Sequence, residues 1–325
     1  MKSNARDGRA LEPERRRGLK RLTGVTPALL TPFDSRNRID LSALRRLVRF
    51  LLASRVSGFY VNGSTGEWAK LSIEERKAVA ETVISEVAGQ VPVVIHVGHF
   101  DVSCALDLAR HAYSQGADMV SSILPSPESS HDEIRGYYCS LASVGLPVIV
   151  YYLEQQAGRL NSAEDFLSEF GAIEGVQGVK YTGKDLYLMY CIHYLSEGKI
   201  KVWSGHDQMA LAGLVMGAEG VIGANYNYLP ELYVEMYEAF QKGDLQHSQH
   251  LQCLASQILW AVKKFGNRRA YRAALKLRGL DIGPCRPPVI PLSAQEMKEL
   301  EAAIQPFSRY FGKITGADQA GDTGV

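Results

Sequence analysis

Short apolar segments alternate along the chain with longer stretches in which apolar residues recur every three or four positions. A short apolar run bounded by glycine, proline or asparagine is typical of a buried strand, and the wider spacing is typical of a helix with one buried face. We therefore predict seven helical segments between eight strands, which lie at residues 25–30, 58–61, 93–97, 118–124, 147–151, 175–183, 201–204 and 220–223.

Polar residues mark where several helices begin. Asp40 precedes an apolar stripe, and its carboxylate is suited to accept hydrogen bonds from the first free backbone N–H groups of a helix. Ser72 is followed three residues later by Glu75, which is the spacing of a capping box, and Ser293 is followed by Glu296 in the same way. These signals predict helices that begin near residues 41, 73 and 294.

Strands that alternate with helices favour a parallel sheet, because each helix returns the chain to the edge where the next strand starts. Eight such units fit an α/β fold, the (β/α)8 TIM barrel. The alternative is an open, doubly wound sheet. Its first strand-to-helix turn is expected to carry the glycine-rich loop of a dinucleotide site, and residues 31–34 (Thr-Pro-Phe-Asp) contain no glycine. The pattern therefore favours the closed barrel.

The barrel pattern does not cover the whole chain. We assign residues 1–22 to a disordered basic N-terminal extension, 23–225 to the barrel, 226–312 to helices that pack on it as a C-terminal helical appendage, and 313–325 to a frayed tail. The extension contains acids and has no apolar core, so we do not interpret it as a secretory signal.

Composition narrows the range of functions. The chain has 36 Lys+Arg and 35 Asp+Glu, and its net charge of +1 gives no reason to expect a nucleic-acid partner. No apolar run is long enough to suggest a membrane span. The five cysteines are odd in number and widely spaced, which favours reduced thiols in a cytoplasmic protein over a disulfide framework or a zinc site.

One lysine ends a predicted strand. The sequence Gly178-Val179 is typical of a buried strand, and Lys180 follows it. An ammonium group is costly to bury, so such a lysine either extends its amine to solvent or is kept partly desolvated for chemistry. Desolvation lowers the pKa of a lysine, and the neutral amine can attack a carbonyl to form a Schiff base. If this stretch is considered alone, the simpler interpretation is that the Lys180 amine extends to solvent.

Residues that end the other strands favour the chemical interpretation. In a barrel they share one rim, which is where barrel enzymes carry their active sites. Tyr151 ends the fifth strand and is able to move protons. The loop Gly63-Ser64-Thr65 follows the second strand and offers backbone N–H and hydroxyl groups to a carboxylate. A 2-oxo acid held by this loop would present its ketone to Lys180.

Four motifs together resemble one enzyme superfamily. They are Gly63-Ser64-Thr65-Gly66-Glu67, Val150-Tyr151, Gly178-Val179-Lys180-Tyr181-Thr182 and Gly217-Ala218-Glu219-Gly220-Val221-Ile222-Gly223. In this order and at this spacing they are similar to the N-acetylneuraminate lyase and dihydrodipicolinate synthase superfamily over about residues 24–310. The residues after Lys180, together with Ser204-Gly205-His206-Asp207, look closer to the lyase branch.

The resemblance implies a class I mechanism on a 2-oxo acid such as pyruvate. Lys180 would form the Schiff base, and Tyr151 would move the proton while a carbon–carbon bond is broken or made. The resemblance also implies that no metal or organic cofactor is needed, that the partners are a small 2-oxo acid and an aldehyde, and that the chain forms a homotetramer. The substrate-binding residues that it implies are Gly63, Ser64, Thr65, Thr182, Gly205, Asp207, Gln208 and Ile222.

Departures from the family pattern bear on the substrate. The arginine that the synthase branch places beyond the tyrosine is Gln156 here, which disfavours lysine biosynthesis. The acid that follows the aspartate in the lyase branch is Gln208, and the hydroxyl residue of the last motif is Ala224, so two contacts to sialic acid are altered. The aromatic pair of the family's proton relay is replaced by residues 126–128, Ser-Pro-Glu.

We therefore predict an aldolase that cleaves or forms a 2-oxo-3-deoxy sugar acid or a 4-hydroxy-2-oxo acid. Two enzyme alternatives are a hydro-lyase (dehydratase) and a dihydrodipicolinate-synthase-like enzyme, each acting on a related 2-oxo acid. The alternative of another class is a barrel that binds a 2-oxo acid without turnover.

Other candidate residues receive structural interpretations. His96 and His99 are spaced as H-x-x-H, but at the end of a strand this spacing does not bring both rings to one metal ion. We interpret His96 as a rim or loop histidine. Lys184 is interpreted as a solvated helix lysine, and Glu67 as a structural carboxylate near a helix N-terminus.

Overall fold

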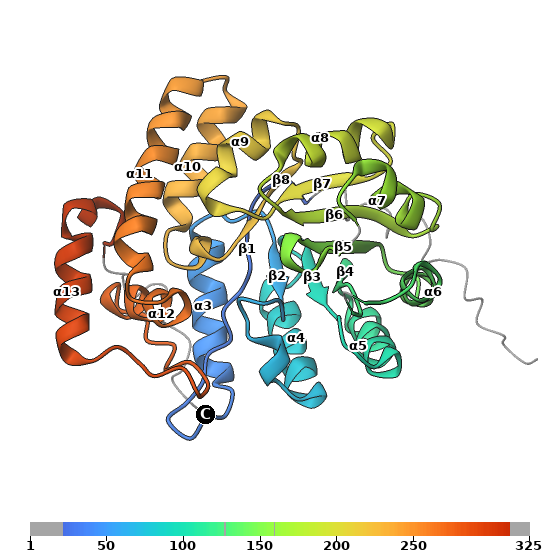
Figure 1. Cartoon of the computed structure of the whole chain (residues 1–325). Helices are drawn as coiled ribbons and strands as arrows, with labels where there is room; N and C mark the ends of the chain where they lie inside the picture. The colour runs from blue at the N-terminus through green and yellow to red at the C-terminus, as the bar shows by residue number, and fades with distance from the viewer. Residues whose placement is uncertain (1–21, 127, 159, 313–325) are drawn as a thin grey trace, which may run out of the picture.

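The computed structural model describes residues 22–126, 128–158 and 160–312. The predicted tail and the predicted extension lie outside these residues, except for Leu22, which is buried. Figure 1 shows the strands at the centre and the helices around them; the strands are β1 Gly24–Pro27, β2 Phe59–Val61, β3 Val93–His96, β4 Met119–Ile123, β5 Val148–Leu153, β6 Val176–Thr182, β7 Lys201–Ser204 and β8 Gly220–Gly223.

The strands form one parallel sheet that closes on itself. Their order is β1-β8-β7-β6-β5-β4-β3-β2, and every neighbouring pair is parallel. A parallel bridge between Ala28 and Tyr60 joins the two ends of this order, where the N–H of Leu29 donates to the carbonyl of Tyr60 at 2.9 Å. The predicted barrel is therefore confirmed, and the open, doubly wound alternative is wrong.

Helices fill the connections between the strands. In the described residues they are α3 Leu41–Ala53, α4 Ile73–Val87, α5 Val102–Gln115, α6 His131–Ala142, α7 Ala163–Phe170, α8 Leu186–Leu195 and α9 Ala210–Val215. The predicted caps are confirmed: the Asp40 carboxylate accepts from the N–H of Ala43 at 2.8 Å, and Ser72 forms a capping box with Glu75. Short 3₁₀ turns lie at η1 Trp68–Lys70, η2 Glu154–Gln156, η3 Asp207–Met209, η4 Asn225–Asn227 and η5 Gln305–Tyr310.

Apolar side chains of the barrel separate into two layers. Alternate strand residues point to opposite faces of a sheet, so one set packs outward against the helices and the other fills the barrel. The indole of Trp203, in the inner set, donates to the carbonyl of Leu22 at 2.7 Å and so ties the start of the described chain to the barrel interior. The inner set consists of Leu22, Ala28, Tyr60, Val94, Met119, Ile123, Ile149, Tyr151, Trp203 and Ile222.

Four helices follow the last strand and pack on one side of the barrel (Figure 1). On α12, the guanidinium of Arg272 donates to the carbonyl of Thr31 at 2.7 Å and so joins this helix to the chain just after β1. The four helices are α10 Pro230–Gln241, α11 Leu245–Lys263, α12 Asn267–Leu277 and α13 Ala294–Ile304.

In the described part of the chain, no helix combines the length and the apolar character that crossing a membrane requires.

Candidate active site

Lys180 extends into the barrel from β6. Its register partners are Tyr151 on β5 and Trp203 on β7, and both belong to the inner apolar set. Residues opposite each other on neighbouring strands point to the same face of a sheet, so Lys180 shares the inner face. Lys180 is only 3% exposed, which excludes the interpretation that its amine extends into bulk water.

Two aromatic rings enclose the Lys180 amine. Its Nζ atom lies 4.0 Å from the ring centroid of Tyr60 and 4.0 Å from that of Tyr151. Burial lowers the pKa of Lys180, while interactions with Tyr151 and the charge of Asp207 oppose this shift. Desolvation favours the neutral amine, which is the nucleophilic form. The site therefore provides the environment that Schiff-base chemistry needs from a lysine.

Tyr60 is a site residue that the sequence analysis did not single out. Its hydroxyl shares a hydrogen bond with the Ser121 hydroxyl at 3.0 Å, and its ring meets that of Tyr151 edge-on with the centroids 5.8 Å apart. All three residues of β2 are buried. Because both faces of the strand are covered, apolar alternation carries no information about which side chain points inward. A polar hydroxyl on an otherwise apolar strand is the one signal that was available.

His96 ends β3, but its ring is buried inside the barrel and is not the open rim or loop histidine that we expected. The residue is 0% exposed, and its ring meets that of Tyr151 edge-on with the centroids 6.0 Å apart. A carbonyl only accepts and an amide N–H only donates. Nδ1, which lies 3.0 Å from the Asn62 carbonyl, therefore carries the proton, and Nε2 accepts from the N–H of Ile123 at 3.3 Å. Burial, with the nearby charges of Arg76 and Lys180, holds the pKa of His96 well below its ordinary value, so the ring is neutral.

A buried arginine on α4 fixes the strand end that carries His96. The guanidinium of Arg76 donates to the carbonyl of His96 at 2.6 Å and to that of Gly98 at 3.0 Å. Burial lowers the pKa of Arg76 to about 10, so it remains charged near neutral pH. Within the described residues, no three His, Cys, Asp or Glu side chains gather into a group that could hold a metal ion.

The loop after β2 is supported from several sides. Gly63 is buried against the Tyr60 ring, where a Cβ atom would lie 2.6 Å from a ring carbon. The hydroxyl of Thr31 donates to the carbonyl of Gly66 at 2.8 Å. Glu67 adopts a left-handed backbone with φ of 62°. Its buried carboxylate lies between the guanidinium of Arg272, at 3.1 Å, and the amine of Lys70, at 2.9 Å. These contacts hold the loop that carries Ser64 and Thr65 in place.

Several buried oxygen atoms in and around this site have no hydrogen-bond partner, and Oγ1 of Thr182 and Oδ1 of Asp207 are among them. The other carboxylate oxygen of Asp207 accepts from the N–H of Ala224 at 3.1 Å, from the N–H of Asn225 at 3.0 Å and from the Asn225 side-chain amide. Burial raises the pKa of Asp207, and the Asn225 donors and the charge of Lys180 oppose that shift. Unpaired buried polar atoms are rare in folded proteins, so these two oxygens are candidate ligand contacts.

The remaining predicted residues occupy different positions. Gly205 is packed so closely that an added Cβ would collide with the Thr182 hydroxyl and lie 2.9 Å from the carbonyl of Tyr181. Ile222 is buried in the barrel interior, whereas Gln208 is exposed. Lys184 is also exposed, as expected. Of the segment that replaces the relay aromatics, residue 127 lies outside the described chain.

A cavity of about 400 Å³ lies at the rim above this site. Ser64 and Thr65 form part of its wall, and Ala224 contributes from the turn after β8. The sequence pattern predicts only a packing role for the C-terminal helices, so the contribution of α12 to this cavity was not expected. That helix and its preceding glycine add Gly266, Asn267, Arg268, Arg269 and Tyr271.

Comparison with known proteins agrees with these observations. Residues 21–306 match the Dihydrodipicolinate synthetase family. The chain is 35% identical over 290 residues to the N-acetylneuraminate lyase of Citrobacter koseri, covering 88% of this chain and 97% of that protein. It is 32% identical over 288 residues to the N-acetylneuraminate lyase of Rhizobium meliloti, covering 88% and 95%.

Solved structures give the same result. A catalytic lysine mutant of the Ruminococcus gnavus sialic acid aldolase superposes with a TM-score of 0.85 at 27% identity, covering 90% of this chain and 97% of that one. The N-acetylneuraminate lyase of Proteus mirabilis superposes with a TM-score of 0.82 at 29% identity, covering 88% and 98%. The resemblance inferred from the four motifs is confirmed, and the chain belongs to the dihydrodipicolinate synthetase family, on its N-acetylneuraminate lyase branch.

Proposed function

We propose that this protein is a class I aldolase, a carbon–carbon lyase that cleaves a 2-oxo sugar acid through a Schiff base on Lys180. The observation that carries the proposal is the position of the Lys180 amine, buried in the barrel 4.0 Å from the centroid of the Tyr151 ring. The matches to two N-acetylneuraminate lyases, which span 97% and 95% of those proteins, support the same reaction class.

In the cleavage direction, the neutral amine of Lys180 adds to the C2 ketone. Tyr151 gives its proton to the departing hydroxide, so that water leaves, an iminium forms and Tyr151 remains as the phenolate. Tyr151 takes the proton from the C4 hydroxyl as the C3–C4 bond breaks, and that electron pair moves into the iminium to form an enamine. The aldehyde leaves, the enamine gains a proton at C3, and water releases the 2-oxo acid from Lys180. The 2-oxo acid and the aldehyde are thus the small-molecule partners.

The other site residues would position this substrate. Gly63 lets the loop approach closely, so that Ser64 and Thr65 can hold the substrate carboxylate with hydroxyl and backbone N–H groups. The unpaired oxygens of Thr182 and Asp207 would each gain a substrate hydroxyl as partner. Gly205 leaves the space beside Thr182, Ile222 forms part of the barrel floor, and Gln208 would reach the outer end of the substrate.

Trapping with borohydride tests the proposal. Reduction of the enzyme in the presence of pyruvate should convert the iminium to a stable secondary amine, detected by mass spectrometry on the peptide that contains Lys180. Lys180→Ala should show no such adduct, and Lys184→Ala should be labelled like the wild type because its side chain is exposed at the start of the next connection. Labelling at Lys184, or none in the wild type, would contradict the assignment.

Product analysis then separates aldolase from dehydratase. Candidate 2-oxo sugar acids are incubated with the enzyme, and release of pyruvate and an aldehyde is measured beside loss of water. Aldehyde release is the expected result. Water loss alone would favour the dehydratase, and binding without either product would favour the non-catalytic barrel.

We also propose that the chain assembles as a homotetramer and works in the cytoplasm. The tetramer is supported only through the family resemblance, and the cytoplasm by the cysteines, all five of which are free. Size-exclusion chromatography with light scattering measures the assembly, and a mass of one or two chains would refute the tetramer. Fractionation of the native cell measures the location, and finding the protein outside the cytoplasmic fraction would refute it.

A further inference from the structure

The rim cavity contains a cation that lacks an acidic partner. Arg268 is the second residue of α12 and is half-buried. Its Nη2 atom donates to the carbonyl of Ser64 at 2.9 Å. In the described part of the chain its guanidinium forms no other hydrogen bond and no ion pair. A guanidinium has five N–H donors, so most of its donor capacity is unused.

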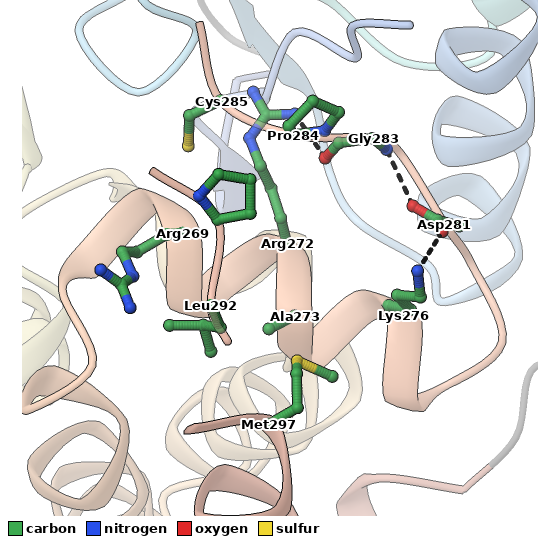
Figure 2. A pocket seen from close by; sticks show the side chains of 11 residues that line it. Arg269, Arg272, Ala273, Lys276, Asp281, Gly283, Pro284, Cys285, Leu292 and Met297 are labelled. Atoms are coloured by element: carbon green, nitrogen blue, oxygen red, sulfur yellow. Dashed lines mark hydrogen bonds and ion pairs between the residues drawn. The ribbon is translucent and has the colours of Figure 1, made fainter. Parts of the chain in front are cut away.

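The neighbouring arginines differ from Arg268 in this respect. Each one has a glutamate partner: Arg269 with Glu296, Arg272 with Glu67, Arg278 with Glu231 and Arg286 with Glu75. Arg269 and Arg272 also line a second cavity, of about 360 Å³, between α12 and the segment that follows it (Figure 2). Lys276 in that cavity pairs with Asp281 at 2.8 Å. The charges of the second cavity are therefore balanced, and it does not call for an anion.

The rim cavity, by contrast, is unbalanced. No acidic side chain is among the described residues that line it. Its volume of about 400 Å³ is in the range of small-molecule sites. Tyr271 also lies in its wall. Burial and the charge of the Asp207 carboxylate raise the pKa of the Tyr271 hydroxyl, and the charge of Arg268 opposes this shift. The cavity thus extends from the proposed carboxylate loop to Ala224, whose N–H donates to Asp207 at 3.1 Å, and Arg268 lies in the same wall.

We propose that Arg268 selects substrates whose aldehyde half carries an anionic group, either a carboxylate or a phosphate. This inference rests on the proposed function, in which the carboxylate of the 2-oxo acid occupies Ser64 and Thr65. The free N–H groups of Arg268 form the planar fork that binds such oxyanions through paired hydrogen bonds. Gln156 stands where the synthase branch has an arginine, and α12 supplies the cation from the other side of the site.

Binding of unreactive probes tests the inference without turnover. The wild-type enzyme is converted by pyruvate and borohydride to its reduced adduct, and calorimetry measures its affinity for glycerol, glycerate and glycerol 3-phosphate. A charge-assisted hydrogen bond is worth about 1.5–3 kcal/mol, so at least one of the two anions should bind about 10- to 100-fold more tightly than glycerol. The anion that binds distinguishes carboxylate from phosphate.

Variants assign the preference to Arg268. Arg268→Gln should lose the preference for the anion, and Arg268→Lys should keep part of it because the charge remains. Lys276→Gln is the matched control, because it removes the same charge from the same helix outside the rim cavity. Turnover should agree: Arg268→Gln should raise KM for glyceraldehyde 3-phosphate or tartronate semialdehyde about 10- to 100-fold more than it raises KM for neutral glyceraldehyde.

Three results would overturn the proposal. Equal binding of all three probes by the wild type would show that there is no anion preference. An Arg268→Gln variant that loses pyruvate trapping, or that slows neutral and anionic aldehydes equally, would show that Arg268 only supports Ser64. If pyruvate does not label the wild type at all, the proposed function fails and this inference fails with it; labelling without an anion preference removes this inference alone.

Discussion

Replacing Lys180 with methionine is expected to stabilise the fold while it abolishes catalysis. Methionine has a similar length and no amine to desolvate. Burial lowers the pKa of Lys180 below its ordinary value of 10.5. A group with a lowered folded-state pKa binds more protons in the unfolded state, so the free energy of unfolding rises with pH between the folded and unfolded pKa values. The penalty that Lys180 imposes is therefore largest at low pH and disappears above the unfolded value.

The size of this effect has an upper bound. Each pKa unit corresponds to about 1.36 kcal/mol, so with an unfolded value of 10.5 the penalty is at most about 5 kcal/mol near pH 7 and about 1 kcal/mol near pH 10. The rings of Tyr60 and Tyr151 stabilise the charged form of the amine by about 0.5–2 kcal/mol each, which keeps the penalty below this bound. Apolar replacement of buried ionic groups gives about 1–4 kcal/mol, and we expect a net gain in this range near pH 7.

Urea denaturation at a fixed protein concentration, followed by tryptophan fluorescence, to which the buried Trp203 contributes, measures the difference. Wild type, Lys180→Met and Lys184→Met are compared near pH 7 and near pH 10. Lys184 is exposed, and its replacement should change the midpoint by little. The reasoning is refuted if Lys180→Met is less stable than the wild type near pH 7, or if its gain is the same near pH 10. Either result would mean that burial does not disfavour the charged amine.

Three further variants test other parts of the site. Tyr151→Phe keeps the ring but removes the hydroxyl, so kcat should fall about 10²- to 10⁴-fold while borohydride trapping of pyruvate persists; an unchanged kcat would remove Tyr151 from the proton transfer. Gly205→Ala should raise KM for the sugar acid at least about 10-fold, because the added Cβ displaces the Thr182 hydroxyl. Its control is Gly136→Ala, where a Cβ meets no atom within 4 Å, and equal KM values in the two variants would contradict the placement. Arg76→Met should lower the free energy of unfolding by about 2–4 kcal/mol, because two buried carbonyls lose their donor; denaturation measures this, and a loss below about 0.5 kcal/mol would show that water replaces the guanidinium.

The sequence by itself determined the elements and their order. Strand runs, helix periodicity and the caps at Asp40, Ser72 and Ser293 depend on contacts within a few residues, and the structure confirms them. Alternation of strands and helices is also a property of the chain, and it was sufficient to predict the barrel. Lys180 and Tyr151 could be placed together because both lie near the carboxyl ends of their strands, each two residues before the end, and parallel strands in one barrel end at the same rim.

Only the tertiary structure decided what surrounds the amine. Tyr60 and His96 lie on strands that are buried on both faces, where no polar alternation shows which side chains point inward. Arg268 and Ser64 are 204 residues apart, and no local signal links them. Their contact depends on how α12 packs beside the rim. Contacts within an element follow from residues a few positions apart, whereas contacts between elements depend on the packing of the whole barrel.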